Sequence, residues 1–209
     1  LICRINTHII AEGMGVKKQL KDSYITNKKI HIIGNGNIAG IDTKYFNSNN
    51  FALKSNLKLV RENFLVNNYK FIFSYIGRIN KDKGIRELLQ AFTKLNNEKI
   101  LLIIVGDFEK RDRFSKLIKS SYLRSKNILW VSWQEDIRNY LKFSNCFVLP
   151  SYREGFPNIL LQAGAMGIPS IVTDVSGSNE IIIDGFNGWI IPTRDTNAIL
   201  EKLNKVSSL

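Results

Sequence analysis

Residues 145–173 decide how this chain folds, and they read NCFVLPSYREGFPNILLQAGAMGIPSIVT. The segment opens with a short apolar run, Cys146–Leu149, which predicts a buried strand. Pro150–Gly155 interrupts that run as a loop. Apolar residues then recur at helical spacing over Phe156–Met166, and Pro169–Thr173 predicts a further buried strand. This order of strand, loop, helix and strand is typical of a parallel α/β sheet.

The loop before the helix is a candidate anion site. Loops that lead from strand to helix lie at the carboxyl edge of a parallel sheet, where open α/β sheets bind ligands. Helix N-termini favour anions, and Pro157 suits a first helical turn. Glu154 lies beside this site, either to complement the helix dipole or to contact a ligand. Gln162 shares a helical line with Asn158, and that line faces either solvent or a ligand.

A second loop carries two cations. The predicted strand Phe71–Ile76 runs into residues 77–84, GRINKDKG, before a helix begins. Arg78 offers a planar fork for phosphate and Lys83 a mobile point charge. The loop is neither a Walker loop nor a G-x-G-x-x-G fingerprint. Its cations are therefore either ordinary solvated side chains or phosphate ligands.

The rest of the chain alternates strands and helices, which predicts a doubly wound parallel sheet. The further strands expected are Ile100–Val105, Ile128–Val131 and Trp189–Ile191. The helices expected between and after them are Gly84–Leu95, Arg111–Ser121, Asp136–Phe143, Ser178–Ile183 and Thr196–Val206. The N-terminal part predicts strands at Leu1–Ile5 and Lys29–Ile33, and helices at Thr7–Leu20 and Leu53–Phe64.

Composition narrows the functional classes. With 209 residues and 44% hydrophobic content, the chain fits one sizeable domain or slightly more. Its longest apolar runs are too short to predict a membrane span. Cys3 and Cys146 lie in apolar runs and are expected to be buried thiols, not a disulfide. With two histidines and two cysteines, we expect no metal site.

The net charge of +12 fits nucleic acid, an anionic membrane surface or phosphorylated substrates. The lysines are scattered and are not interleaved with aromatic residues, so we expect no nucleic-acid partner. An anionic membrane surface stays open as a partner.

Together the two loops resemble the signature of retaining nucleotide-sugar glycosyltransferases of family 4. That signature joins Pro-Ser, an acidic residue with Gly, a second acidic residue after seven intervening positions, and a small-residue run with G-x-P. The matching residues here are Pro150-Ser151, Glu154-Gly155, Ala163–Gly167 and Pro169. The family's G-R-x-x-x-x-K-G matches Gly77–Gly84. The chain departs at Gln162, where the family has Glu.

The resemblance implies roles for these residues. Arg78 and Lys83 would hold the donor diphosphate, and Glu154 would contact the donor sugar; these three are the predicted catalytic residues. At the ribose, Gln162 offers one acceptor and one NH₂ donor, whereas a carboxylate accepts from both hydroxyls. The predicted donor-binding residues are Gly77, Arg78, Lys83, Gln134, Glu154, Gly155, Phe156, Pro157, Asn158 and Gln162.

The resemblance extends to weaker segments. Ser132–Gln134 occupies the place where the family cradles the base, although Trp133 is expected in the core. Glu180 is a weaker site candidate in a segment that resembles the family's closing region. The Gly-Asn run 34–37 resembles the link between the two Rossmann-like domains of the GT-B fold. We therefore expect residues 1–50 to be the tail of an N-terminal domain and the linker, 51–192 the nucleotide-sugar-binding domain, and 193–209 a C-terminal helix.

The expected function is transfer of a sugar from a nucleotide-diphosphate donor, UDP by default, to a glycan or polyprenyl-linked acceptor in capsule or envelope polysaccharide synthesis. The resemblance implies no metal or other cofactor, and a cytoplasmic protein at the inner face of the membrane. An N-terminal GT-B domain would supply the acceptor site, so this chain alone should bind donor but transfer little. Two alternatives stay open: a sugar-nucleotide epimerase on the same fold, and a non-catalytic nucleotide-binding or interaction module.

Overall fold

The computed structural model describes residues 2–37, 39–49, 68–109, 117–118, 122 and 125–209. In this part of the chain the main feature is a six-stranded sheet of order β5-β4-β3-β6-β7-β8, in which every neighbouring pair is parallel. The strands are β3 (Phe71–Ile76), β4 (Ile100–Val105), β5 (Ile128–Val131), β6 (Cys146–Leu149), β7 (Ser170–Thr173) and β8 (Gly188–Ile191).

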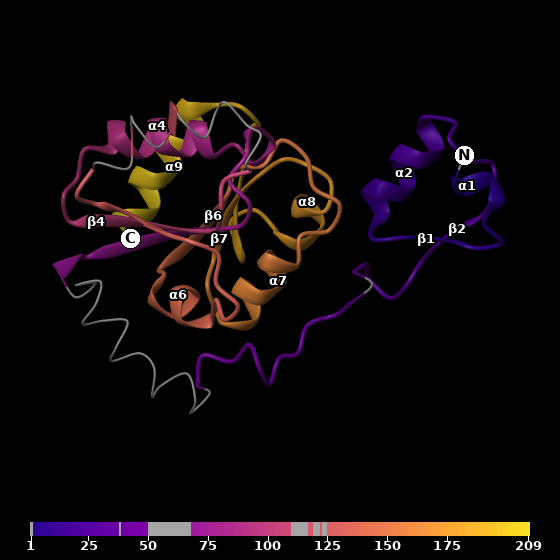
Figure 1. Cartoon of the computed structure of the whole chain (residues 1–209), viewed down its shortest axis with the longest axis horizontal. Coiled ribbons are helices and arrows are strands. Elements are labelled where there is room, and N and C mark those ends of the chain that lie inside the picture. Colours follow the sequence, from indigo (N-terminus) through magenta and orange to yellow (C-terminus); the bar gives the residue numbers. More distant parts are fainter. Residues whose placement is uncertain (1, 38, 50–67, 110–116, 119–121, 123–124) are drawn as a thin grey trace.

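Helices cover both faces of this sheet, as the alternating pattern predicts (Figure 1). The helices α4 (Ile85–Leu95) and α9 (Thr196–Ser207) lie together on one face. The helices α6 (Arg138–Phe143) and α7 (Asn158–Ala165) lie on the other, followed by the short α8 (Ser178–Ile181). Strands enclosed on both sides are mostly apolar, and β4 and β6 are apolar and buried at every position. The predicted α/β fold with a doubly wound parallel sheet is confirmed.

The N-terminal residues form a small β-α-β unit of their own. Strands β1 (Ile9–Ala11) and β2 (Ile30–Ile32) pair in parallel, and α2 (Met14–Asp22) connects them. The predicted strand Lys29–Ile33 is confirmed. The prediction for Leu1–Ile5 is wrong, because Ile2–Ile5 forms the helix α1. The predicted helix Thr7–Leu20 is wrong in its first half.

The error has a physical cause. Ile9–Ala11 has a parallel partner in β2 and buries Ile9 and Ala11 against Ile30, so its backbone groups pair in a ladder. Tertiary pairing therefore overrides the weak helical pattern. Cys3 lies on α1 and is half-buried, contrary to the expectation of a buried strand residue, whereas Cys146 is buried as expected. Burial raises the pKa of the Cys146 thiol to about 12.

Predicted strand bounds in the main sheet agree closely with the structure, and helix starts differ by up to two residues. Helix α7 begins at Asn158: Pro157 is its extended N-cap residue and not part of the first turn, and proline disfavours helical backbone at the preceding Phe156. Helix α6 begins at Arg138, two residues after the predicted start, and the Asp136 carboxylate before the N-cap Ile137 accepts from the Arg138 N–H at 3.0 Å. The predicted helix Leu53–Phe64, most of Arg111–Ser121 and the boundary at residues 50 and 51 lie outside the described residues.

The segment after β2 that contains Tyr45, called the linker below, contacts the main domain through Arg138, which is 8% exposed. Its guanidinium stacks 3.7 Å above the Tyr45 ring centroid and lies 2.6 Å from Asp136 Oδ2. This hydrogen-bonded ion pair holds the pKa of the Asp136 carboxyl below its usual range. The linker therefore joins the domain at an aromatic and ionic contact on α6.

We expect Leu203→Ala to destabilise the chain by about 2–5 kcal/mol, because Leu203 on α9 is fully buried and the truncation leaves a cavity. Urea unfolding measures the change. Leu209→Ala is the control, since Leu209 is 88% exposed, and it should change stability by less than about 0.5 kcal/mol. Equal effects of the two substitutions would show that α9 does not belong to the core.

Asp136 predicts a pH dependence of stability. Because its folded-state pKa is depressed, its contribution is present above the unfolded pKa of about 4 and is lost as pH falls through the folded value. Wild type should therefore lose more stability between about pH 5 and 2 than Asp136→Asn does. Urea unfolding at several pH values tests this, and parallel pH profiles of the two proteins would contradict it.

Candidate donor site at the carboxyl edge of the sheet

Two loops meet at the carboxyl edge of the central strands. One follows β3 (residues 77–84) and the other follows β6 (residues 150–157). The Tyr152 N–H donates to the Asp82 carbonyl at 2.8 Å, and Arg153 pairs with the Asp82 carboxylate at 2.6 Å. Gly84, at φ 63°, makes this approach feasible, because a Cβ there would lie 2.0 Å from the Pro150 carbonyl oxygen.

The meeting of the loops brings Lys83 and Glu154 together. Lys83 Nζ lies 2.6 Å from Glu154 Oε1, and the side chains are 21% and 10% exposed. A pair shielded to this degree is screened less by solvent than a surface pair. The structure thus unites the cation and the carboxylate that the sequence predicts as separate site residues.

Tyr75 stabilises this site from the core side of the loop after β3, and it was not predicted from the sequence. It is fully buried at the end of β3, and its hydroxyl donates to the Arg78 carbonyl at 2.6 Å. Burial raises the pKa of the Tyr75 phenol, and the nearby Glu154 carboxylate raises it further. The hydroxyl therefore stays protonated and holds the backbone of the loop. Its sequence signal is a polar tip in a mostly apolar strand.

Arg78 is placed differently from Lys83. Its side chain is 72% exposed and lies 3.2 Å from Glu109 Oε1. Asn80 also donates to Glu109, at 3.4 Å. The structure therefore puts Arg78 at the rim of the site, paired with a carboxylate that the sequence analysis left without a role. Exposed pairs of this kind contribute little to stability.

A cavity of about 260 Å³ opens beside Arg78. Its wall contains the predicted site residues Gly77, Arg78 and Gln134, together with Trp133. The expectation that Trp133 is a core residue is wrong, because the side chain is 66% exposed in the loop after β5. Trp130 takes the inner position instead: its indole N–H donates to the Gly106 carbonyl at 2.8 Å.

The start of α7 carries the remaining predicted residues. Pro157 is the N-cap residue, and Asn158 accepts a hydrogen bond from the Asn37 amide of the linker. Asn158 and Gln162 lie one turn apart on α7, and Gln162 is half-buried. Gly155 and Phe156 precede the helix in the loop that carries Glu154. The predicted residues 154–158 thus form the end of the β6 loop and the first residue of α7.

A groove of about 520 Å³ separates α2 from the β6 loop. One wall contains Lys18, Gln19 and Asp22 of α2, and the other contains Arg153 and Glu154. The Glu154 side chain therefore contacts Lys83 and also lines this groove. The sequence alone missed the groove, because its two walls come from segments far apart in the chain.

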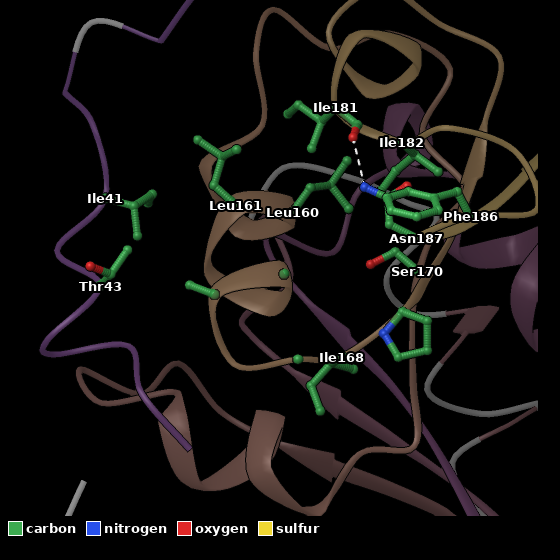
Figure 2. Close-up of a pocket in the computed structure, with 14 residues that line it drawn as sticks. Ile41, Thr43, Leu160, Leu161, Ile168, Ser170, Ile181, Ile182, Phe186 and Asn187 are labelled. Carbon is green, nitrogen blue, oxygen red and sulfur yellow. Dashed lines mark hydrogen bonds between the residues drawn. The ribbon is translucent and has the colours of Figure 1, made fainter. Parts of the chain in front are cut away.

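A larger, mostly apolar cavity of about 670 Å³ lies between α7, α8 and the linker (Figure 2). Leu160 and Leu161 line it from α7, and Ile41 lies across from them on the linker. Asn187 closes one end, where its amide donates to the Ile181 carbonyl at 3.0 Å. Ser170, the first residue of β7, lies in its wall, so this cavity is at the opposite edge of the sheet from the Lys83–Glu154 pair.

Two absences hold for the described part of the chain. Among those residues, no group of three or more His, Cys, Asp or Glu side chains is arranged to hold a metal ion. No helix within the same ranges has the length and apolar character needed to cross a membrane.

Comparison with known proteins identifies the family. Residues 58–209 match the model of the family described as glycosyl transferases group 1. The chain belongs to this family. It is 31% identical over 207 residues to the capsular polysaccharide biosynthesis glycosyltransferase CapM of Staphylococcus aureus, covering 96% of this chain and 52% of CapM. The resemblance to glycosyltransferases is thereby confirmed.

A second relative has a named reaction. It is the UDP-Gal:alpha-D-GlcNAc-diphosphoundecaprenol alpha-1,3-galactosyltransferase of Escherichia coli, which is 28% identical over 194 residues. The match covers 90% of this chain and 48% of that enzyme. The chain thus spans about half the length of the curated relatives it matches.

Solved structures share the fold. Anabaena HepE in complex with UDP and glucose superposes with a TM-score of 0.83 at 18% identity, over 97% of this chain and 54% of HepE. WaaG, a glycosyltransferase involved in lipopolysaccharide biosynthesis, gives a TM-score of 0.76 at 20% identity, over 96% of this chain and 53% of WaaG. These structures are GT-B glycosyltransferases, and the likeness confirms the predicted fold.

A double-mutant cycle on Lys83 and Glu154 should give a coupling energy of about 1–3 kcal/mol, because removing either partner leaves a shielded charge without compensation. Urea unfolding of the Lys83→Ala, Glu154→Ala and double variants measures it. The control cycle uses Arg78 and Glu109, whose exposed side chains should couple by less than about 1 kcal/mol. Equal coupling in both cycles would contradict the special status of the shielded pair.

Proposed function

We propose that this chain is the donor-binding half of a retaining glycosyltransferase that uses a nucleotide-diphosphate sugar. The observation that carries the proposal is the ion pair between Lys83 and Glu154. At the sheet edge it places a cation that can bind phosphate beside a carboxylate that can accept from sugar hydroxyls. The chain that carries this pair belongs to a glycosyltransferase family.

Binding of the diphosphate would recruit three groups. Lys83 would exchange its Glu154 partner for a phosphate oxygen, and the exposed Arg78 fork would turn from Glu109 to the diphosphate. Backbone N–H groups of Gly155–Asn158 at the start of α7 would add to the anion site. As the bond between sugar and diphosphate breaks, negative charge grows on the phosphates, so these contacts strengthen in the transition state.

The same exchange would release Glu154 for the sugar. A carboxylate accepts hydrogen bonds from sugar hydroxyls, and Glu154 lies in a wall of the groove beside α2. Glu154 thus passes from neutralising Lys83 to orienting the donor sugar. The chemistry proposed for the site requires no metal or other cofactor.

The small cavity beside Arg78 would take the nucleobase. Trp133 offers an exposed aromatic face there, and Gln134 offers an amide. We propose UDP as the nucleotide, because the E. coli relative is named for UDP-Gal and HepE is complexed with UDP. Gln162 would contact the ribose hydroxyls through its single acceptor and its NH₂ donor.

For the acceptor we propose a glycan or polyprenyl-linked saccharide in capsule or envelope polysaccharide synthesis. The E. coli relative and a relative from Campylobacter jejuni, 30% identical over 135 residues, are named for diphospho-undecaprenol acceptors. We further propose that an N-terminal GT-B domain holds the acceptor. The net charge of +12 favours binding of the protein to the anionic cytoplasmic face of the membrane, where we propose that it acts.

Calorimetric titration of the chain with UDP, GDP and ADP tests the donor site. We expect one diphosphate, UDP, to bind, and we expect Lys83→Ala and Arg78→Ala each to weaken it by about tenfold or more through loss of a charge-assisted contact. Glu154→Gln should bind UDP at least as well as wild type, because Lys83 is then free, but should lose the added affinity for a UDP-sugar.

Lys81→Ala is the matched control, since Lys81 is an exposed cation of the same loop and should change UDP affinity by less than about twofold. A folded chain that binds none of the three nucleotides would overturn the donor-site proposal. Conversion of one UDP-sugar into another without an acceptor would instead indicate an epimerase.

A further inference from the structure

Helix α2 of the N-terminal unit lacks a cap of its own. All of this helix is described, and its first turn contains no acidic residue. The N-cap position is Gly13, which makes no side-chain capping bond, and Gly15 lies in the first turn. Glycine weakens a helix end by its backbone freedom, and the first N–H groups of a helix need outside partners.

Glu180 supplies those partners from α8, 165 or more residues away in the chain. Its Oε2 accepts from the Met14 N–H at 2.6 Å, and its Oε1 accepts from the Gly15 N–H at 2.9 Å. The same Oε1 accepts from the Gly177 N–H at 3.1 Å, at the start of α8. A carboxylate at the positive end of a helix makes charge-assisted hydrogen bonds, which are stronger than neutral ones.

Glycines allow the two segments to come this close. A Cβ on Gly13 would lie 2.8 Å from the Phe156 ring and 2.9 Å from Glu180 Oε2. A Cβ on Gly36 would lie 2.6 Å from the same ring. The ring of Phe156, which belongs to the loop that carries Glu154, therefore packs against Gly13 and Gly36. A larger residue at either position would therefore require the Phe156 ring or its surroundings to shift.

The start of α8 also contacts the backbone of the loop that carries Glu154. A Cβ on Gly177, at φ 78°, would lie 2.2 Å from the Gly155 carbonyl oxygen, so the start of α8 lies directly on that loop. Asn37 adds a second bridge: its N–H donates to the Glu12 carbonyl at 2.6 Å, and its side-chain amide donates to Asn158. The start of α2, the start of α8 and the loop with Glu154 thus form one connected joint.

We propose that Glu180 is a positioning residue that latches the N-terminal β-α-β unit, residues 9–32, onto the donor domain. Its carboxylate holds the start of α2 and so fixes the wall of the groove opposite Glu154. Gly15 and Ser176, which flank the latch, both line that groove. An effect of this latch on sugar transfer rests on the proposed function, in which Glu154 binds the donor sugar across the groove from α2.

Amide hydrogen exchange in Glu180→Ala tests the latch without any nucleotide. We expect the Met14 and Gly15 amides to exchange about tenfold faster or more, because both lose their acceptor. Glu180→Gln should show a smaller increase, since its amide oxygen still accepts but carries no charge. Amides of β3 and β4 should keep the wild-type rates. Glu201→Ala, which removes an exposed carboxylate from α9, should change none of them.

The same variants are titrated with UDP to separate the two proposals. Glu180→Ala should weaken UDP binding less than Lys83→Ala or Arg78→Ala does, because both cations lie outside the latch and only the backbone of the loop with Glu154 touches it. Unchanged exchange at Met14 and Gly15 would overturn the latch. So would accelerated exchange throughout the sheet, since Glu180 would then support the core. Failure of wild type to bind UDP would overturn the donor site, while the exchange rates would still decide the latch.

Discussion

The close approach of the loops after β3 and β6 is the constraint on which the candidate site depends. Strands β3 and β6 are neighbours in the sheet, although α4, β4, β5 and α6 lie between them in the chain. Gly84 has no side chain, so the backbone at Pro150 can come against it. Lys83 directly precedes Gly84 and Glu154 lies shortly after Pro150, so this approach brings the two charges together. Each charge is compensated by the other as soon as the domain has folded.

This arrangement assembles the site before any ligand arrives. The Tyr75 hydroxyl holds the Arg78 carbonyl from inside the core, and Asp82 ties one loop to the backbone and side chain of the other. Ordering such loops costs conformational entropy, and contacts formed during folding offset that cost. A ligand that binds to preordered loops loses less of its binding free energy to ordering. The Glu180 joint extends the same principle to the wall of the groove formed by α2.

Prediction from sequence succeeded where local chemistry decides and failed where packing decides. Strands such as Ile100–Val105 were correct because an apolar, β-branched run bounded by turn residues has one common outcome. Ile9–Ala11 was misread as helix because its partner strand lies about twenty residues further on. Trp133 was expected in the core, but the inner position belongs to Trp130, three residues earlier at the end of β5. Hydrophobicity alone does not tell such tryptophans apart.

Local sequence patterns are enough to define the class of fold and the loops that carry charge. Periodicity defines strands and helices, their alternation requires a parallel sheet, and the loops with Arg78, Lys83 and Glu154 then lie at one edge of it. Which loops become neighbours depends on strand order, and strand order depends on how all the layers pack. The pairing of Lys83 with Glu154, the support from Tyr75 and the capping of α2 by Glu180 all join residues far apart in the chain. No local pattern encodes such contacts, since each arises from the close approach of surfaces that exist only after folding.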